Sequence, residues 1–213
     1  MKVDKASMLL YAITDRAWLG DNSLGEQVEQ AIKAGVTIVQ LREKHLDFEA
    51  FVKQAKEIKK VTDRYKIPFI INDNIEVALA CNADGIHVGQ SDMTAGNVRS
   101  LIGEDKILGV SAQTVEQAIL AEKNGADYLG VGAMFSTSTK LDADAVTFDT
   151  LKAICTAVSI PVVAIGGIGE HNILKLKGSG IEGVAVVSAI FAQTDIFAAT
   201  ERLTALANEM VEV

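Results

Sequence analysis

Short apolar runs rich in β-branched residues recur along the chain, and the segments between them are longer and more polar. The runs are too short for helices, and they lack the regular polar alternation of a half-exposed strand. Strands that are buried on both faces have this pattern. The sequence therefore predicts eight strands, at 8–14, 37–42, 68–73, 85–90, 106–112, 127–133, 161–167 and 183–189.

Several of the longer segments carry apolar residues at helical spacing. In the segment 23–35, Leu24, Val28 and Ile32 fall on one face, and Gly35 is a suitable end for a helix. A helix with one apolar face needs an apolar surface to pack on, and the predicted strands would supply it. Helices are predicted at 23–35, 48–65, 114–125, 170–180 and 195–211.

Strand and helix alternate about eight times, which predicts an α/β protein with a parallel sheet. No linker rich in Pro, Gly or Ser divides the chain, so residues 1–213 are predicted to form one domain. Eight βα units in one undivided chain predict a compact (β/α)8 TIM barrel. An open doubly wound sheet is the alternative, but it would carry a GxGxxG turn after its first strand, and YAITDRAWLGD (11–21) lacks one.

A barrel of this kind carries its active groups at the C-terminal ends of its strands. In this sequence polar and small residues gather at those ends. They are far apart along the chain but meet on one rim, so their coincidence says more than any single motif. The residues are Thr14, Asp15, Gln40, Arg42, Lys44, Asn72, Asp73, Gln90, Asp92, Ser111, the loop 136–140, Gly166, Gly167, Val187 and Ser188.

Three polar side chains alternate in TIVQLREKH (37–45), at the end of the second predicted strand. Gln40, Arg42 and Lys44 would face one side of an extended chain. The guanidinium fork of Arg and the point charge of Lys both suit phosphate oxygens. The row is interpreted as a grip for a polyphosphate, with a solvated strand end as the alternative.

Two carboxylates follow neighbouring strands. Asp73 ends the third predicted strand, and Asp92 lies just beyond the fourth. Adjacent strands lie about 5 Å apart, so the two acids can share a cation. One or two carboxylates completed by water and substrate phosphate describe a Mg²⁺ site. The alternatives are helix capping by Asp73 and a turn role for Asp92.

Glycines follow the seventh predicted strand, in AIGGIG (164–169), and VAVVSAI (184–190) contains the eighth. Gly166 and Gly167 would let a ligand approach the backbone, and the N–H groups of a following helix attract anions. Barrels often bind phosphate at this seam, so a phosphate site is predicted there. A tight turn without a ligand is the alternative.

The loop FSTSTKLDADA (135–145) is long for a connection between a strand and a helix. Its hydroxyl groups precede Lys140, and such loops can close over a ligand. Lys140 would then join Arg42 and Lys44 over the pocket. Several cations beside two acids make sense when a diphosphate with Mg²⁺ lies between them. A plain surface loop is the alternative.

The net charge of −8 argues against general nucleic-acid binding, which needs a basic face, and weakly against an anionic membrane surface. No apolar run reaches the roughly 18 residues that span a bilayer, and no secretion signal is present, so we expect a cytoplasmic protein. Cys81 and Cys155 lack metal or redox spacing and are expected to pack as free thiols. His87 could reach the site from the fourth predicted strand, but it is interpreted as a core histidine, and Tyr11 is interpreted as a packing residue. The oligomeric state is left open, a homo-oligomer included.

Taken together, YAITD, QLREK, PFIINDN, ADGIHVGQSD, ILGVSAQT, ADYLGVGAMFSTSTK, VVAIGGI and GVAVVSAI closely resemble the thiamine-phosphate synthase family. The matches run in order from about residue 9 to 191. The resemblance implies an enzyme that joins hydroxymethylpyrimidine diphosphate to hydroxyethylthiazole phosphate and releases diphosphate. It also implies a dissociative mechanism, in which the diphosphate leaves, a pyrimidine methyl cation forms and the thiazole nitrogen attacks. That chemistry needs charge neutralisation and alignment more than a general base.

The resemblance also assigns residues by position. The pyrimidine diphosphate would contact Gln40, Leu41, Arg42, Glu43, Lys44, Asn72, Ser111 and Lys140. The thiazole phosphate would contact Thr137, Ser138, Thr139, Gly167, Val187 and Ser188. Asp73 and Asp92 would hold Mg²⁺, and the catalytic group would be Arg42, Lys44, Ser111 and Lys140.

Two positions depart from the family pattern. The family usually has Pro where this chain has Ser136, and commonly His where it has Gln113. Two rival hypotheses have their own signatures. A barrel that isomerises a monophosphate would not need Arg42, Lys44 and both acids together, and thiazole tautomerases are expected to use a histidine near Gln113. A regulator that only senses phosphorylated ligands would not need the diphosphate-handling residues.

Overall fold

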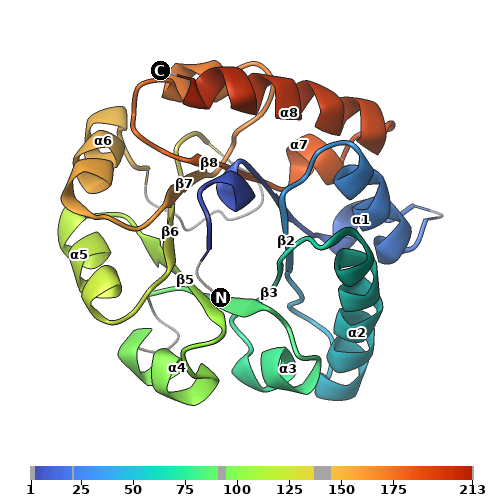
Figure 1. Ribbon diagram of the computed structural model, residues 1–213. Coiled ribbons are helices and arrows are strands. Elements are labelled where there is room, and N and C mark those ends of the chain that lie inside the picture. The colour runs from blue at the N-terminus through green and yellow to red at the C-terminus, as the bar shows by residue number, and fades with distance from the viewer. Residues whose placement is uncertain (1–2, 21, 91–94, 137–144, 213) are drawn as a thin grey trace.

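Eight parallel strands close into a barrel within the residues that the computed structural model describes, 3–20, 22–90, 95–136 and 145–212. Each strand pairs with the next along the chain, and β8 pairs with β1 (Figure 1). The predicted (β/α)8 barrel is therefore confirmed. The strands are β1 Leu10–Ile13, β2 Ile38–Leu41, β3 Phe69–Asn72, β4 Gly85–Val88, β5 Ile107–Ala112, β6 Tyr128–Val131, β7 Val162–Ile165 and β8 Gly183–Val186.

Helices surround the barrel as an outer ring (Figure 1). In the described part of the chain, no helix is long and apolar enough to cross a membrane. The α-helices are α1 Leu24–Lys33, α2 Phe48–Tyr65, α3 Ile75–Ala80, α4 Ala95–Ile102, α5 Val115–Lys123, α6 Phe148–Ala157, α7 Ser188–Phe191 and α8 Ile196–Val211. Three 3₁₀ turns complete the elements, η1 Ala6–Met8, η2 Arg16–Trp18 and η3 Ile173–Leu176.

The helix predicted at 170–180 is wrong, because this segment forms only the 3₁₀ turn η3. Two local features oppose a longer helix. The side chain of Asn172 folds back onto the preceding loop, where it accepts from the N–H of Gly169 and donates to the carbonyl of Gly167. Gly178 and Gly180 then take positive φ angles of 78° and 92°, which a right-handed helix excludes.

The end of the last predicted strand, 183–189, also differs from the structure. Strand β8 ends at Val186, and Ser188 already begins the short helix α7. The run VAVVSAI is apolar across both elements, so its composition does not mark the boundary between them.

The strands separate two apolar clusters, one inside the barrel and one between the barrel and its helices. In β1, Tyr11 and Ile13 belong to the interior cluster, whereas Leu10 and Ala12 belong to the outer one. This is the two-residue period of a strand with both faces buried. The turn η1 lies across one end of the barrel in Figure 1, and its Met8 belongs to the interior cluster.

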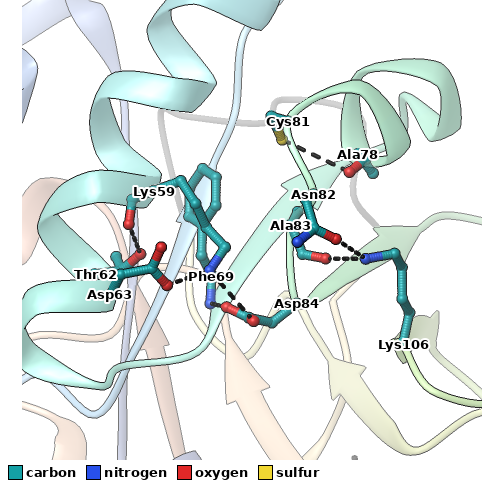
Figure 2. A network of polar contacts seen from close by, with 10 residues as sticks. All are labelled: Lys59, Thr62, Asp63, Phe69, Ala78, Cys81, Asn82, Ala83, Asp84 and Lys106. Carbon is teal, nitrogen blue, oxygen red and sulfur yellow. Dashed lines mark hydrogen bonds and ion pairs between the residues drawn. The ribbon is translucent and has the colours of Figure 1, made fainter.

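A repeated pair of hydrogen bonds joins the strands at their N-terminal ends. The residue just before each even-numbered strand bonds the start of the preceding strand twice, through its own N–H and through its side chain. In Figure 2, the carboxylate of Asp84 accepts from the N–H of Phe69 at 2.8 Å. The four pairs are Thr37 with Leu10, Asp84 with Phe69, Asp127 with Leu108 and Glu182 with Val162.

A cation supports each acidic member of this set. Lys59 lies 3.5 Å from Asp84, Arg99 lies 2.5 Å from Asp127, and Lys5 lies 2.7 Å from Glu182. Burial lowers the pKa of Lys59, but the hydrogen bonds and charges of Asp63 and Asp84 outweigh it and raise that pKa above its ordinary value. Ion pairs as well as hydrogen bonds thus join the strands at the N-terminal rim. These contacts serve stability, which is the usual role of this face of a barrel.

Candidate active site

A cavity of about 510 Å³ opens at the C-terminal ends of the strands. Residues from all eight strands or the loops that follow them line it, which is where a barrel carries its active groups. The cavity is lined by Tyr11, Ile13, Gln40, Arg42, Lys44, Asn72, Asp73, His87, Gly89, Gln90, Ser111, Gln113, Gly130, Gly132, Ala133, Val163, Ile165, Gly166, Gly167, Ile168, Ala185, Val186, Val187 and Ser188.

A second hollow, of about 770 Å³, lies at the opposite end of the barrel, beside η1 and the end of α8. Its lining includes Lys5 and Glu182, which already pair with each other, and the glycine-containing segment 177–181. This hollow is larger, but it lies away from the strand ends on which the polar residues gather. The cavity at the C-terminal ends is therefore the candidate active site.

The row predicted at the end of β2 does meet at one wall of this cavity. Gln40 is buried inside the barrel, and Arg42 and Lys44 follow the last residue of the strand. The backbone N–H of Arg42 donates to the hydroxyl of Thr14 at 3.2 Å, and its guanidinium lies 3.9 Å from the carboxylate of Asp15. These contacts from the end of β1 hold Arg42 at the cavity.

The neighbours of this row point elsewhere. Leu41 is fully buried in the cluster between the barrel and its helices. The carboxylate of Glu43 accepts from Arg16 at 2.7 Å. Neither residue is part of the described lining, so a contact between either of them and a ligand in the cavity would have to come from the backbone.

Asp73 stands at the cavity in a conformation that few residues adopt. Its φ is 62°, in the left-handed region that Asp and Asn tolerate better than most. The N-cap of α3 is Asn74, which accepts from the N–H of Val77 at 2.9 Å, so Asp73 does not cap that helix. The carboxylate of Asp73 instead accepts from the amide of Asn72. Strained backbone of this kind is found at functional sites.

A chain of hydrogen bonds crosses the floor of the cavity. The amide of Gln40 donates to the hydroxyl of Tyr11 at 2.8 Å, which lies 2.8 Å from the hydroxyl of Tyr128. That hydroxyl lies 3.0 Å from Nδ1 of His87, whose Nε2 lies 3.0 Å from Oγ of Ser111. Five residues from five strands are thus connected. Burial raises the pKa of both tyrosines, which keeps their hydroxyl groups protonated.

Glycines make room for this chain. Gly109 lies between His87 and Tyr128 in the strand pairing, and a Cβ atom there would lie 2.3 Å from the hydroxyl of Tyr128 and 2.5 Å from Nδ1 of His87. A Cβ atom at Gly130 would also come close to this imidazole, at 3.0 Å from Cε1 of His87. The two rings can therefore meet, with centroids 5.5 Å apart.

The loop after β7 brings two glycines with positive φ to the cavity, Gly166 at 100° and Gly167 at 63°. Val187 and Ser188 line the cavity beside them, after β8. The residues of the predicted phosphate seam therefore line one cavity. The segment after β7 contains η3 instead of the expected helix.

Sequence reasoning missed Tyr128 as a site residue and interpreted Tyr11 and His87 as core residues. Tyr11 and Tyr128 are buried, as core residues are, but all three side chains take part in the chain. The two-residue period of a strand could have placed Tyr11 inside the barrel, because it stands two residues before Ile13 and therefore on the same inward face of β1.

Five predicted residues lie outside the described part of the chain, namely Asp92, Thr137, Ser138, Thr139 and Lys140. Among the described residues, no three of His, Cys, Asp and Glu gather as a metal cluster would.

This chain is similar to known proteins over nearly its whole length. The sequence profile of thiamine monophosphate synthase matches residues 10–190. A thiamine-phosphate synthase of Clostridium tetani (strain Massachusetts / E88) is 54% identical over 200 residues, which cover 94% of this chain and 96% of that protein. One of Ruminiclostridium cellulolyticum is 56% identical over 199 residues, which cover 93% and 95%. The solved structure of a thiamine phosphate pyrophosphorylase from Pyrococcus furiosus superposes with a TM-score of 0.90 at 36% identity, covering 98% of this chain and 99% of that one.

Proposed function

The chain belongs to the thiamine-phosphate synthase family, and on this premise we propose that its two substrates meet in the cavity at the C-terminal ends of the strands. The reaction joins hydroxymethylpyrimidine diphosphate to hydroxyethylthiazole phosphate and yields thiamine phosphate and diphosphate. One observation carries the proposal, namely that a single cavity gathers Arg42, Lys44 and Asp73. Two cations beside a carboxylate suit a diphosphate that binds together with a divalent cation.

In this proposal Arg42 and Lys44 hold the diphosphate and stabilise the charge that develops on it as it leaves. Thr14 fixes the backbone at Arg42, and Asp15 lies 3.9 Å from the guanidinium, so the side chain stands near the cavity before the bond breaks. Preorganised donors aimed at developing charge make a large contribution to many enzymes. Lys140 would add a further cation from its loop.

The pyrimidine ring would lie deeper, between Gln40 and Ser111, with Asn72 at the end of β3 beside it. Apolar walls from Ile13, Val163 and Ala185 line the same depth of the barrel. Such walls exclude water from a ring that becomes cationic when the diphosphate leaves, which favours attack by the thiazole nitrogen over attack by water.

The thiazole phosphate would bind at the seam after β7 and β8. Gly167, Val187 and Ser188 line the cavity there, and Gly167 has a positive φ of 63°. Backbone N–H groups in such turns form concave anion sites. Thr137, Ser138 and Thr139 would complete this site from the neighbouring loop.

The donor set of this cavity fits Mg²⁺, with Asp73 as the described ligand and Asp92 as the second. Mg²⁺ is usually held by one or two carboxylates, water and substrate phosphate rather than by a cage of protein side chains. When bound, the cation would neutralise part of the charge on the diphosphate.

A product assay tests this proposal. Purified protein is given both substrates with and without Mg²⁺, and thiamine phosphate and diphosphate are followed together. We expect equal amounts of the two products, formed only with Mg²⁺. Asp73→Ala should lower kcat/KM by about 100-fold or more, because Mg²⁺ would lose a ligand and the diphosphate would lose the cation that neutralises its charge.

The matched control is Asp149→Ala, which removes an exposed carboxylate from α6 and should leave the rate unchanged. Full activity of Asp73→Ala at ordinary Mg²⁺ concentration would overturn the metal assignment. A folded wild-type protein that yields no thiamine phosphate would overturn the proposed use of the cavity.

A further inference from the structure

Two of the proposed pyrimidine diphosphate contacts are joined through the protein. Gln40 stands on β2 and Ser111 on β5, with strands β3 and β4 between them. Between their side chains run Tyr11, Tyr128 and His87, linked by contacts of 2.8 to 3.0 Å. The proposed function gives these three residues no role of their own.

The order of donors along this chain follows from its first link. The amide nitrogen of Gln40 can only donate, so the hydroxyl oxygen of Tyr11 accepts. Tyr11 is buried, and leaving its own proton without an acceptor would be costly, so it donates to Tyr128. Tyr128 then donates to Nδ1 of His87.

The last hydrogen bond, between His87 and Ser111, determines whether the Ser111 hydroxyl can donate to a ligand. With Nδ1 accepting, a neutral His87 carries its proton on Nε2 and donates it to Oγ of Ser111. The hydroxyl of Ser111 has then used its oxygen as an acceptor, and its own proton remains available to a ligand in the cavity. A reversed chain would point the Ser111 proton at His87, and Tyr11 would accept from both Gln40 and Tyr128, which leaves the proton of Tyr11 without an acceptor.

The packing supports a fixed geometry rather than a flexible contact. A Cβ atom at Gly109 would clash with both His87 and Tyr128, so the two rings occupy the space that this glycine leaves. The side-chain amide of Gln90 donates to the backbone carbonyl of Ser111 at 2.6 Å, which fixes the strand at that residue.

We propose that Tyr11, Tyr128 and His87 are positioning residues that present Ser111 as a hydrogen-bond donor to an acceptor atom of the pyrimidine diphosphate. This inference rests on the proposed function for the identity of that substrate. The substrate would lose a correctly directed donor if the chain were broken, although none of the three residues need react.

The first test measures the tautomer of His87 by ¹⁵N NMR on histidine-labelled protein at the pH of the assay. The protein has three histidines. The exposed His45 and His171 serve as references once their resonances have been assigned by substitution. We expect a neutral ring with the proton on Nε2 and a hydrogen-bonded Nδ1. Tyr128→Phe should shift the Nδ1 resonance to that of a nitrogen without a donor. A proton on Nδ1 in the wild type would overturn the proposal.

The second test is kinetic. Tyr128→Phe should lower kcat/KM for the pyrimidine diphosphate by about 10-fold, with less than about a twofold change in KM for the thiazole phosphate. Tyr11→Phe should have a smaller effect, because Tyr128 can still donate to His87. Tyr65→Phe is the matched control, since it also removes a hydroxyl hydrogen bond, here to Glu29 on the outer surface.

The outcomes separate this inference from the proposed function. Unchanged kcat/KM for the pyrimidine diphosphate in both folded variants, Tyr128→Phe and Tyr11→Phe, would overturn the positioning role even if the wild type is fully active. An equal rise in KM for both substrates would also overturn it, because that result indicates a general structural defect. The NMR measurement needs no substrate, so it tests the order of donors even if the wild type makes no product.

Discussion

At the scale of single residues, Gly167 occupies a position that no other residue suits. Its φ is 63°, and a Cβ atom there would lie 2.4 Å from the carbonyl oxygen of Ser136 and 2.8 Å from that of Phe135. Both clashing atoms belong to the backbone, so a rotamer change cannot relieve them. The loops after β6 and β7 are thus in contact at the proposed thiazole phosphate site.

Gly167→Ala should therefore raise KM for the thiazole phosphate and destabilise the protein by more than about 2 kcal/mol, from left-handed strain plus the clash. Gly20→Ala is the control, because Gly20 has a similar φ of 55° but open space around it. That variant should lose only about 1 kcal/mol and keep its KM. Urea denaturation and steady-state kinetics measure both effects. Equal values for the two variants would show that the contact with Ser136 and Phe135 is unimportant.

At the scale of elements, the two ends of the strands differ in what they do. The N-terminal ends are tied by the side chain that precedes each even-numbered strand, as Asp84 is tied to Phe69 in Figure 2. The C-terminal ends instead present side chains to the cavity. The sheet can therefore be weakened at one end without moving the groups at the other.

Asp84→Ala should destabilise the protein by about 1–3 kcal/mol, because the N–H of Phe69 loses its side-chain acceptor. Asp63→Ala is a matched control, since Asp63 on α2 also pairs with Lys59 (Figure 2), but its side chain is largely exposed. Its loss should cost under about 0.5 kcal/mol. Urea denaturation gives both values, and kcat/KM should stay at the wild-type level in each variant. Lower activity of folded Asp84→Ala would contradict the separation of the two ends.

Much of this architecture was predictable, and the exceptions have physical causes. The helix 48–65 has the predicted bounds because its apolar face is regular and Asp47 caps its start. The helices α3, α4, α6 and α7 were not predicted, and of these α3 and α7 have only six and four residues, too few for a helical period to show. Three of the cavity's polar residues were recognised as a row, but the link from Gln40 to Ser111 was not. It depends on which side chains meet inside the closed barrel, and that is a property of the tertiary fold.

At the scale of the whole molecule, a ligand that binds in the cavity at the C-terminal ends of the strands should raise the free energy of unfolding of the barrel. A ligand that binds only the folded state at about 100 times its Kd adds about 2.7 kcal/mol to the free energy of unfolding. The pyrimidine diphosphate with Mg²⁺ should therefore raise Tm, and omission of Mg²⁺ should remove most of that rise. This measurement reports binding without catalysis.

Two variants locate the effect. Arg42→Lys keeps the charge but loses the guanidinium fork, so its Tm without ligand should match the wild type while its ligand-induced rise shrinks. Asp84→Ala should show the reverse, with a lower starting Tm and a full rise, because distant sites contribute independently. If the ligand-induced rise were the same in Arg42→Lys as in the wild type, the diphosphate would bind away from Arg42. If it were lost in Asp84→Ala, the two ends of the barrel would be energetically coupled, and the N-terminal ties would have to be counted among the determinants of substrate binding.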